Sequence, residues 1–226
     1  MPLAIFDLDE TLLCGDTASL FCRRLVKLGL ATPDFLAEEA RLMEAYATRT
    51  LDMADYVRFL MRPLSQLSTA QVAALLPAFI AEDIAPRIYP QAHQLLHTLA
   101  EQNTRILIIS ATPTFLVRAV AEHLGVADVL AIDLTVTDNH YNGEIEGIAS
   151  YQAGKITRLE AWLRDHPFPR ADMTFYSDSP NDLPLLEYVP HPVATNPSPV
   201  LEAIAHENQW DILHWQAPSA CLATQP

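Results

Sequence analysis

The sequence predicts an α/β fold in which a parallel sheet is interrupted by a long helical insert after its first strand. Short apolar runs without helical periodicity, at residues 3–6 and 105–110, predict buried strands. Helical patterns alternate with such runs in the second half of the chain, which is typical of βαβ units. Residues 29–86 carry no strand pattern. The insert is therefore expected between the first two strands.

Local signals place helices before and within the insert. Apolar residues spaced at i, i+4 and i+7 predict a helix over residues 21–28. Residues 52–56 and 68–71 are predicted helix starts. Pro63 and Pro77 are predicted to break the helices that contain them, because proline lacks the backbone N–H.

After the insert, apolar runs and helical patterns alternate again. In order, we predict a helix over 91–100, a strand at 105–110, a helix over 116–124, a β-hairpin over 132–145, a helix over 156–163, and strands at 173–176 and 192–194. Only the tail after Trp215 carries no such pattern.

Composition narrows the class of protein. Half of the 226 residues are hydrophobic, which suits one domain with an insertion or two small ones. The formal net charge of -14 predicts no binding to nucleic acid, since attraction to phosphate backbones depends on clustered Lys and Arg. No apolar stretch approaches the roughly 18 residues of a membrane span. We therefore expect no membrane association and a cytoplasmic location, as a monomer or homodimer.

Three cysteines are few and odd in number. This count argues against a disulfide framework and suits a reducing compartment. Cys14 lies near the run of acids at residues 7–11, but no activating base stands beside it in the sequence. We interpret it as a packing residue.

Polar residues follow the predicted strands at four places. They are the run from Asp7 to Thr11, Ser110, Lys155 at a helix start, and the run from Asp178 to Asp182. Each alone has an ordinary explanation as a turn, a helix cap or a solvated charge. Because open α/β sheets place their chemistry beyond the carboxyl ends of parallel strands, the four together predict one polar site.

This ordered set resembles the four motifs of the haloacid dehalogenase superfamily. The insert resembles the cap of its phosphoserine-phosphatase-like branch, subfamily IB. The resemblance implies a three-layer, Rossmann-like parallel sheet core with a helical cap inserted after the first strand. It divides the chain into a core domain of residues 1–16 and 86–226 and a cap domain of residues 17–85. The expected enzyme is a phosphatase acting on a small phosphorylated metabolite.

The chemistry of a phosphomonoester gives the two leading acids different roles. Asp7 would attack phosphorus and carry an aspartyl-phosphate. Asp9 would protonate the leaving oxygen and later take a proton from the attacking water. Within the superfamily, an acid at the position of Asp9 favours phosphate chemistry over cleavage of carbon–halogen bonds.

Other residues are expected to hold the phosphate. The hydroxyls of Thr11 and Ser110, with backbone N–H groups such as that of Ala111, would bind its oxygens. Lys155 would neutralise charge on the phosphate and on the nucleophile.

The surplus of carboxylates at this edge predicts a divalent cation. Oxygen donors suit the octahedral shell of Mg²⁺. By resemblance, the ligands would be Asp7, the backbone carbonyl of Asp9, and Asp178. Asp182 and Asn181 are expected to reach the metal, a metal-bound water or the bound phosphate.

Substrate choice is expected to depend on the cap. Asp16 stands where phosphoserine phosphatases have a Glu that meets the substrate ammonium, so an amine-bearing substrate is expected. Ser110, Ala111 and Thr112 depart from the Ser-Gly-Gly of those enzymes, which leaves histidinol phosphate as a competitor of phosphoserine. A cap arginine would be needed to bind a carboxylate, and the candidates are Arg41, Arg49, Arg58 and Arg62.

Two other functions stay open at this point. One is phosphoryl transfer to an acceptor other than water, including a lipid-linked phosphate. The other is a phosphate-binding regulator without catalysis. A competing metal site at His93 and His97 lacks an obvious third ligand, so we interpret the two histidines as a polar helix face.

Overall fold

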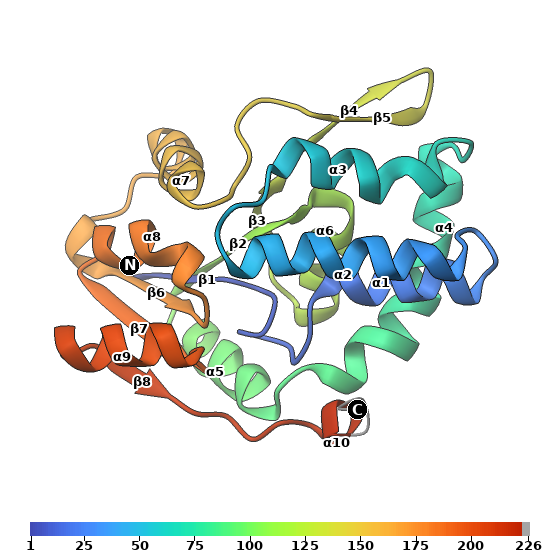
Figure 1. The fold of residues 1–226 in the computed structure, drawn as a ribbon. Helices are drawn as coiled ribbons and strands as arrows, with labels where there is room; N and C mark the ends of the chain where they lie inside the picture. The colour runs from blue at the N-terminus through green and yellow to red at the C-terminus, as the bar shows by residue number, and fades with distance from the viewer. Residues whose placement is uncertain (223–226) are drawn as a thin grey trace.

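The computed structural model describes residues 1–222 and contains a six-stranded sheet in the order β3-β2-β1-β6-β7-β8 (Figure 1). Every neighbouring pair in it is parallel. The strands are β1 (Leu3–Phe6), β2 (Arg105–Pro113), β3 (Asp128–Ile132), β6 (Met173–Ser177), β7 (His191–Thr195) and β8 (Asp211–Leu213). The predicted α/β class with a parallel core is confirmed.

Helices cover both faces of this sheet. They are α1 (Thr17–Lys27), α2 (Pro33–Ala47), α3 (Met53–Met61), α4 (Thr69–Phe79), α5 (Pro90–Glu101), α6 (Thr114–Leu124), α7 (Ala153–Asp165), α8 (Leu183–Tyr188), α9 (Pro199–Asn208) and α10 (Ser219–Leu222). In Figure 1, α7 to α9 lie on the left of the view beside β6 to β8, and α1 to α4 extend to the right. The arrangement has three layers.

The central strand β1 shows why the layers form. Its side chains alternate between the two faces, as the pleat of a strand requires. Ala4 and Phe6 join one apolar cluster with α1, α5 and α6, whereas Leu3 and Ile5 join another with α7, α8 and α9. All four side chains are buried. A continuous apolar run is therefore what a strand covered on both faces needs.

All elements between Thr17 and Arg87 are helical, as predicted for the insert. Asp52 caps α3, and Ser68 forms a capping box with Gln71 at the start of α4, so both predicted helix starts are confirmed. The apolar faces of α1, α3 and α4 join the cluster that covers one face of the sheet. The insert thus packs directly on the core, and the domain boundaries at residues 16 and 86 stay a prediction.

The predicted break at Pro77 is wrong. Pro77 lies inside α4, which continues to Phe79 and then passes into a π-helical turn at Ile80–Ile84. A proline costs its helix one hydrogen bond but does not have to end it when packing holds the segment. Val72 and Phe79 on the same helix are fully buried, and they supply that packing. Pro63, by contrast, does follow the end of α3.

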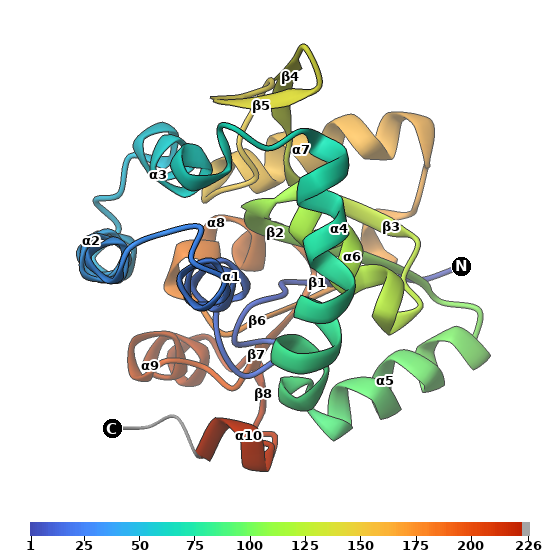
Figure 2. The same ribbon diagram turned by 90° about the vertical axis from the view of Figure 1, so that its right-hand side faces the viewer.

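A two-stranded antiparallel hairpin, β4 (Leu134–Thr137) and β5 (His140–Ile145), confirms the predicted hairpin. Figure 2 shows it projecting from the sheet toward α3. Gly143 of the hairpin packs against α3, because a Cβ added to it would lie 3.7 Å from the Arg58 backbone. The N–H of Thr69 in α4 donates to the carbonyl of Asn139 in the hairpin turn at 2.7 Å. The hairpin therefore contacts the insert at two points.

Several elements near the C-terminus were not predicted, and α8 and α9 are two of them. The strand at 192–194 is not the last one, because β8 adds another parallel strand at the sheet edge. α10 lies in the tail for which no element was predicted. Both are short, and three or four residues are too few to show periodicity in a sequence.

The cysteines also differ from the prediction, since Cys14 and Cys221 form a disulfide. Their Cα atoms are 6.2 Å apart although 207 positions separate them. After β8 the chain runs back and places α10 beside the loop that follows β1 (Figure 1). The expectation that the cysteines form no disulfide is therefore wrong, and a cytoplasmic location stays a prediction. Cys22 is buried and free.

Within residues 1–222, no single helix is long and apolar enough to cross a membrane. One pair, Met53–Leu64 with Thr69–Arg87, meets the length and composition criteria jointly, but it is bent by 92°.

Candidate active site

The structure brings the four predicted polar segments together at one edge of the sheet. Asp7 follows β1, Asp178 follows β6, and Ser110 lies within the end of β2. Lys155 lies in the first turn of α7. Parallel strands end at the same edge, so residues far apart in sequence become neighbours there.

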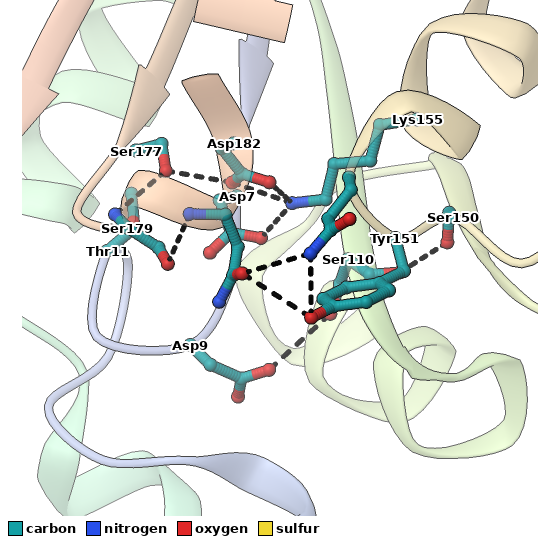
Figure 3. Close-up of polar contacts among 12 residues, drawn as sticks. Asp7, Asp9, Thr11, Ser110, Ser150, Tyr151, Lys155, Ser177, Ser179 and Asp182 are labelled. Carbon is teal, nitrogen blue, oxygen red and sulfur yellow. Dashed lines mark hydrogen bonds and ion pairs between the residues drawn. The ribbon is translucent and has the colours of Figure 1, made fainter. Parts of the chain in front are cut away.

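Lys155 lies between two carboxylates (Figure 3). Its Nζ donates to Asp7 Oδ1 at 2.7 Å and to Asp182 at 2.7 Å, and the Lys155 side chain is only 2% exposed. Ser177 Oγ donates to Asp182 Oδ2 at 2.8 Å. Burial alone would lower the pKa of Lys155, but Asp182 and Asp7 raise it above its usual value. The lysine is therefore a fixed cation beside the predicted nucleophile.

Tight backbone packing fixes the position of this lysine. A Cβ on Gly154 would lie 2.1 Å from the carbonyl oxygen of Ala149, so only glycine fits before Lys155. Gln152 adopts a positive φ of 48° at the helix start. Ser150 Oγ donates to the carbonyl of Ser110, which ties this loop to β2 (Figure 3).

Asp9 is held by groups of the insert and of β2. Its Oδ1 accepts the Thr17 N–H at 2.7 Å. Its Oδ2 accepts from Thr112 Oγ1 at 2.9 Å and from Ser110 Oγ at 3.4 Å. Burial, followed by the charge of Asp16, raises the pKa of Asp9 to about 7. A carboxyl group with such a pKa can both donate and accept a proton near neutral pH.

Thr11 is engaged with Asp178. Thr11 Oγ1 donates to Asp178 Oδ1 at 2.9 Å and accepts the Asp178 N–H at 3.1 Å. Burial, with the nearby charge of Asp7, raises the pKa of Asp178 well above its usual value. Thr11 thus orients a carboxylate in this structure, whereas a phosphate contact was predicted for it.

Asn181 joins the core to the insert. Its Nδ2 donates to the carbonyl of Tyr46 in α2 at 3.2 Å, and its Oδ1 accepts from Tyr151 Oη at 3.4 Å. Asn181 and Asp182 lie in the short helical turn Pro180–Asp182 that leads into α8. Both side chains are almost fully buried. Their observed contacts are therefore structural ones.

A cavity of about 230 Å³ lies at this edge of the sheet between core and insert. From the core it is lined by Asp7, Asp9, Glu10, Ala111, Thr112, Asp178 and Ser179. The other half, called the insert half, is lined by Met43, Tyr46, Ala47, Met53 and Tyr56 of the insert and by Asp16, which precedes the insert and caps its first helix. No Lys or Arg belongs to this lining within the described part of the chain.

Sequence reasoning missed several cavity residues. Tyr46, Tyr56 and Thr112 were assigned no role, although the first two form much of the wall and the third binds Asp9. Tyrosines on a helical pattern are usually packing residues, so no local signal singled them out. The departure of Thr112 from the Ser-Gly-Gly pattern was the one available signal.

The donor set fits a hard divalent cation. Burial raises the pKa of Asp7 to about 7, with Lys155 acting in the opposite direction. Asp178 lines the same cavity without an ion pair to Lys or Arg in residues 1–222. Within residues 1–222, no group of three His, Cys, Asp or Glu side chains lies close enough together to hold a metal ion without further ligands. The fit is therefore to two carboxylates completed by a carbonyl and water.

Comparison with known proteins agrees with this geometry. A family model described as haloacid dehalogenase-like hydrolase matches residues 4–187. The chain belongs to this family. It is 36% identical over 219 residues to a histidinol-phosphatase from Neisseria meningitidis serogroup C (strain 8013), covering 95% of this chain and 99% of that protein. It is 28% identical over 213 residues to a phosphoserine phosphatase from Mycobacterium tuberculosis (strain ATCC 25618 / H37Rv), covering 92% and 69%.

Solved structures of similar fold extend the comparison. A protein of unknown function from Bordetella pertussis Tohama I superposes with a TM-score of 0.84 at 34% identity, covering 93% of this chain and 97% of that one. A phospho-aspartyl intermediate analogue of a phosphoserine phosphatase superposes with a TM-score of 0.70 at 18% identity, covering 98% and 97%. The chain is a phosphatase of the haloacid dehalogenase superfamily, as the resemblance implied.

Proposed function

We propose that this protein is a Mg²⁺-dependent phosphomonoesterase that acts through an aspartyl-phosphate on a small, amino-acid-like metabolite. The observation that carries the proposal is the pairing of Asp7 with buried Lys155 in a cavity that Asp9 also lines. Lys155 is a fixed cationic partner of Asp7, and Asp9, two residues further on, has a raised pKa. Phosphoryl transfer requires such a nucleophile and such an acid.

In the first step, an Asp7 oxygen attacks phosphorus while the bond to the leaving alkoxide breaks. Lys155 favours the ionised form of Asp7 and reduces the repulsion between Asp7 and the dianionic phosphate. Asp9 donates a proton to the leaving oxygen. Its two oxygens are held by Thr17 and Thr112, so its position is fixed before the substrate binds.

In the second step, water hydrolyses the aspartyl-phosphate. Asp9, now ionised, takes the proton from the attacking water, and Asp7 is released as a carboxylate. The backbone N–H of Ala111 at the cavity wall is a candidate donor to the phosphate oxygens. Ser110 and Thr11 support Asp9 and Asp178 in the resting site, and a phosphate contact by either would require rotation of its hydroxyl.

The proposed ligands of Mg²⁺ are Asp7, the Asp9 carbonyl and Asp178. When bound, the ion supplies positive charge against the phosphate oxygens and the surrounding acids. We revise the predicted role of Asp182, since its oxygens contact Lys155 and Ser177. It orients the lysine, and Asn181 anchors the insert.

The relatives suggest two substrates. Phosphoserine carries an ammonium and a carboxylate, and histidinol phosphate carries amines and no carboxylate. Asp16 lines the cavity beside the insert residues and provides a carboxylate for an ammonium group in either case.

Turnover by the purified protein tests the proposal. We expect Mg²⁺-dependent hydrolysis of p-nitrophenyl phosphate that falls by about a thousandfold or more in Asp7→Asn. Asp211→Asn, a change of the same kind at an exposed position on β8, is the matched control. Retained activity in Asp7→Asn would contradict the proposal. Adding acceptor alcohols and searching for new phosphate esters separates hydrolysis from transfer to another acceptor.

A further inference from the structure

Thr112 brings a hydroxyl group to the cavity wall beside Asp9. The residue lines the cavity and is 4% exposed. Its Oγ1 donates to Asp9 Oδ2 at 2.9 Å, whereas Ser110 Oγ lies 3.4 Å from the same oxygen. Of the two hydroxyl contacts to Asp9, the one from Thr112 is therefore the closer.

An irregularity in β2 directs this hydroxyl. Between Ile109 and Pro113, β2 has two residues more than the facing stretch of β3. Within this bulge, the Thr112 N–H donates to Ser110 Oγ at 3.1 Å, which closes a local turn. Bulges at the end of a sheet commonly re-aim a side chain toward a functional site. Here the side chain that leaves the regular ladder is the one that reaches Asp9.

Local chemistry also restricts the movement of Thr112. Its side chain is branched at Cβ, which restricts rotation about χ1. Pro113 follows it, and a proline ring disfavours helical backbone angles at the preceding residue. The hydroxyl therefore has few other positions and stays beside Asp9.

The two carboxyl oxygens of Asp9 face different kinds of donor. Oδ1 accepts the Thr17 N–H at 2.7 Å, and an amide N–H can only donate. Oδ2 faces the hydroxyls of Thr112 and Ser110, which can accept as well as donate. A proton on Asp9 is therefore better accommodated on Oδ2, the oxygen that Thr112 holds.

We propose that Thr112 is a positioning residue for proton transfer, which holds Asp9 Oδ2 where its proton passes to the leaving oxygen of an alkyl phosphate. As the bond from Asp7 to phosphorus forms, the bond to the leaving oxygen breaks and that oxygen takes the proton. Oδ2 is left negatively charged, and the Thr112 hydroxyl stabilises it by donating to it. The inference rests on the proposed phosphatase function, and it adds the class of ester to which the site is adapted.

Esters of aliphatic alcohols need this proton more than aryl esters do, because an alkoxide is a far stronger base than a phenolate. A series of leaving groups therefore tests the role. The leaving oxygens of p-nitrophenyl phosphate, phenyl phosphate and ethyl phosphate increase in basicity in that order. With Mg²⁺ present, kcat/KM reports the first step, which ends when the alcohol is released.

Thr112→Val replaces the hydroxyl with a methyl group at nearly constant volume. We expect kcat/KM to fall by about tenfold or more for ethyl phosphate and by less than about twofold for p-nitrophenyl phosphate. Phenyl phosphate should lie between them. Thr112→Ser keeps a hydroxyl and should restore most of the kcat/KM for ethyl phosphate.

Two comparisons serve as controls for the leaving-group effect. Thr114→Val removes a hydroxyl two residues further on, which bonds Asp133 and lies outside the cavity lining, so it should leave the effect of the leaving group unchanged. Ethyl phosphate and O-phosphoethanolamine are both alkyl esters, so Thr112→Val should lower kcat/KM for both by the same factor. The kcat for all esters should fall, because Asp9 also takes a proton from water when the shared aspartyl-phosphate is hydrolysed.

Denaturant unfolding of the metal-free protein adds a readout without turnover. Thr112→Val and Asp9→Ala each remove one partner of the same hydrogen bond. Their effects on stability should therefore be non-additive in a double-mutant cycle. Additive effects would overturn the proposed contact.

An equal loss of kcat/KM for all three esters in Thr112→Val would also overturn the proposal, since that pattern indicates phosphate binding or a structural role. Unchanged kcat/KM for ethyl phosphate would do the same. Hydrolysis of p-nitrophenyl phosphate by the unmodified protein is measured separately. Its absence contradicts the proposed phosphatase function, and the unfolding cycle still tests the contact between Thr112 and Asp9.

Discussion

The two halves of the active-site cavity use charge in opposite ways. In the core half, Lys155 lies 2.7 Å from both Asp7 and Asp182, so the predicted nucleophile has a cationic partner. In the insert half, Asp16 and the hydroxyl of Tyr56 have no cationic partner within residues 1–222. The core half thus fixes its nucleophile before a substrate binds, whereas the insert half presents an acid that no Lys or Arg in residues 1–222 neutralises.

This difference separates chemistry from selection. Paired and hydrogen-bonded groups keep one geometry, which suits a nucleophile that must meet phosphorus in line. Unpaired groups leave desolvation uncompensated, so they favour whichever ligand supplies the missing partner. Changes in the core half should therefore reduce turnover of every substrate, whereas changes in the insert half should alter preference among substrates.

Removing the charge of Lys155 should have the largest effect. In Lys155→Met, Asp7 and Asp182 are left buried without a cation, which we expect to lower the free energy of unfolding by about 3–5 kcal/mol. Turnover of all phosphomonoesters should fall by about a thousandfold. Adding Asp182→Asn should restore part of the stability and none of the activity. Recovery of activity in the double variant would contradict the assignment of Lys155 to the nucleophile.

Breaking the disulfide tests whether the halves depend on the C-terminal tail. We expect Cys221→Ser to lower the free energy of unfolding by about 2–4 kcal/mol, because the bond between Cys14 and Cys221 closes a long loop. Denaturant unfolding would measure it, and substrate preference should not change. Reductant should destabilise the unmodified protein and not the variant. Equal sensitivity of both proteins to reductant would argue against the bond.

A methyl group at Gly154 should disturb the core half without removing any functional atom. Its Cβ would meet the Ala149 carbonyl, so α7 and Lys155 have to shift. We expect Gly154→Ala to cost about 1–3 kcal/mol and to lower kcat for every substrate alike. Ala153→Ser, at the exposed neighbouring position, is the control. If Gly154→Ala altered the preference among substrates, the core half would contribute to substrate selection as well as to chemistry.

The titration of Asp16 should give the smallest effect, confined to the insert half. Burial, followed by the charges of Glu39 and Glu10, raises the pKa of Asp16 from 3.8 to about 6. Below that pH Asp16 is neutral, so the ratio of kcat/KM for O-phosphoethanolamine to that for ethyl phosphate should decline several-fold as pH falls through about 6. Because the ammonium lowers the second phosphate pKa of O-phosphoethanolamine, the same ratio measured in Asp16→Asn is the control for the titration of the phosphates.

Asp16→Asn should flatten this pH profile and keep the cap of α1, because Asn is an equally good N-cap. Protonated Asp16 favours the folded state, and this contribution is lost as pH rises from about 4 to about 6. The variant should therefore be at least as stable as the unmodified protein at neutral pH. A persistent inflection near pH 6 would assign the titration to another group.

Most of the fold was readable from local patterns. The apolar run before Asp7 and the capping residues Asp52 and Ser68 act within a few positions, so the sequence displays them directly. Pro77 was misread because tertiary packing outweighed a local preference. β8 was missed because three residues carry too little pattern.

The candidate site divides in the same way. The order of Asp7, Ser110, Lys155 and Asp178 along the chain, each near the end or start of an element, was enough to predict that they meet. Their detailed partners were not predictable, and Thr11 bonds Asp178 across 167 positions. Such contacts depend on how helices and loops approach in space, which no local pattern encodes.

The sequence by itself determined most of the elements and the cluster of acids at the sheet edge, because these follow from periodicity and from residue types at strand ends. The resemblance of the ordered motifs determined the family. Only the tertiary structure decided which atoms are paired. It left Tyr56 without a partner, joined Asn181 to α2, and brought Cys221 to Cys14. Pairing is a property of distance in space, and distances between remote segments are fixed only when the whole core packs.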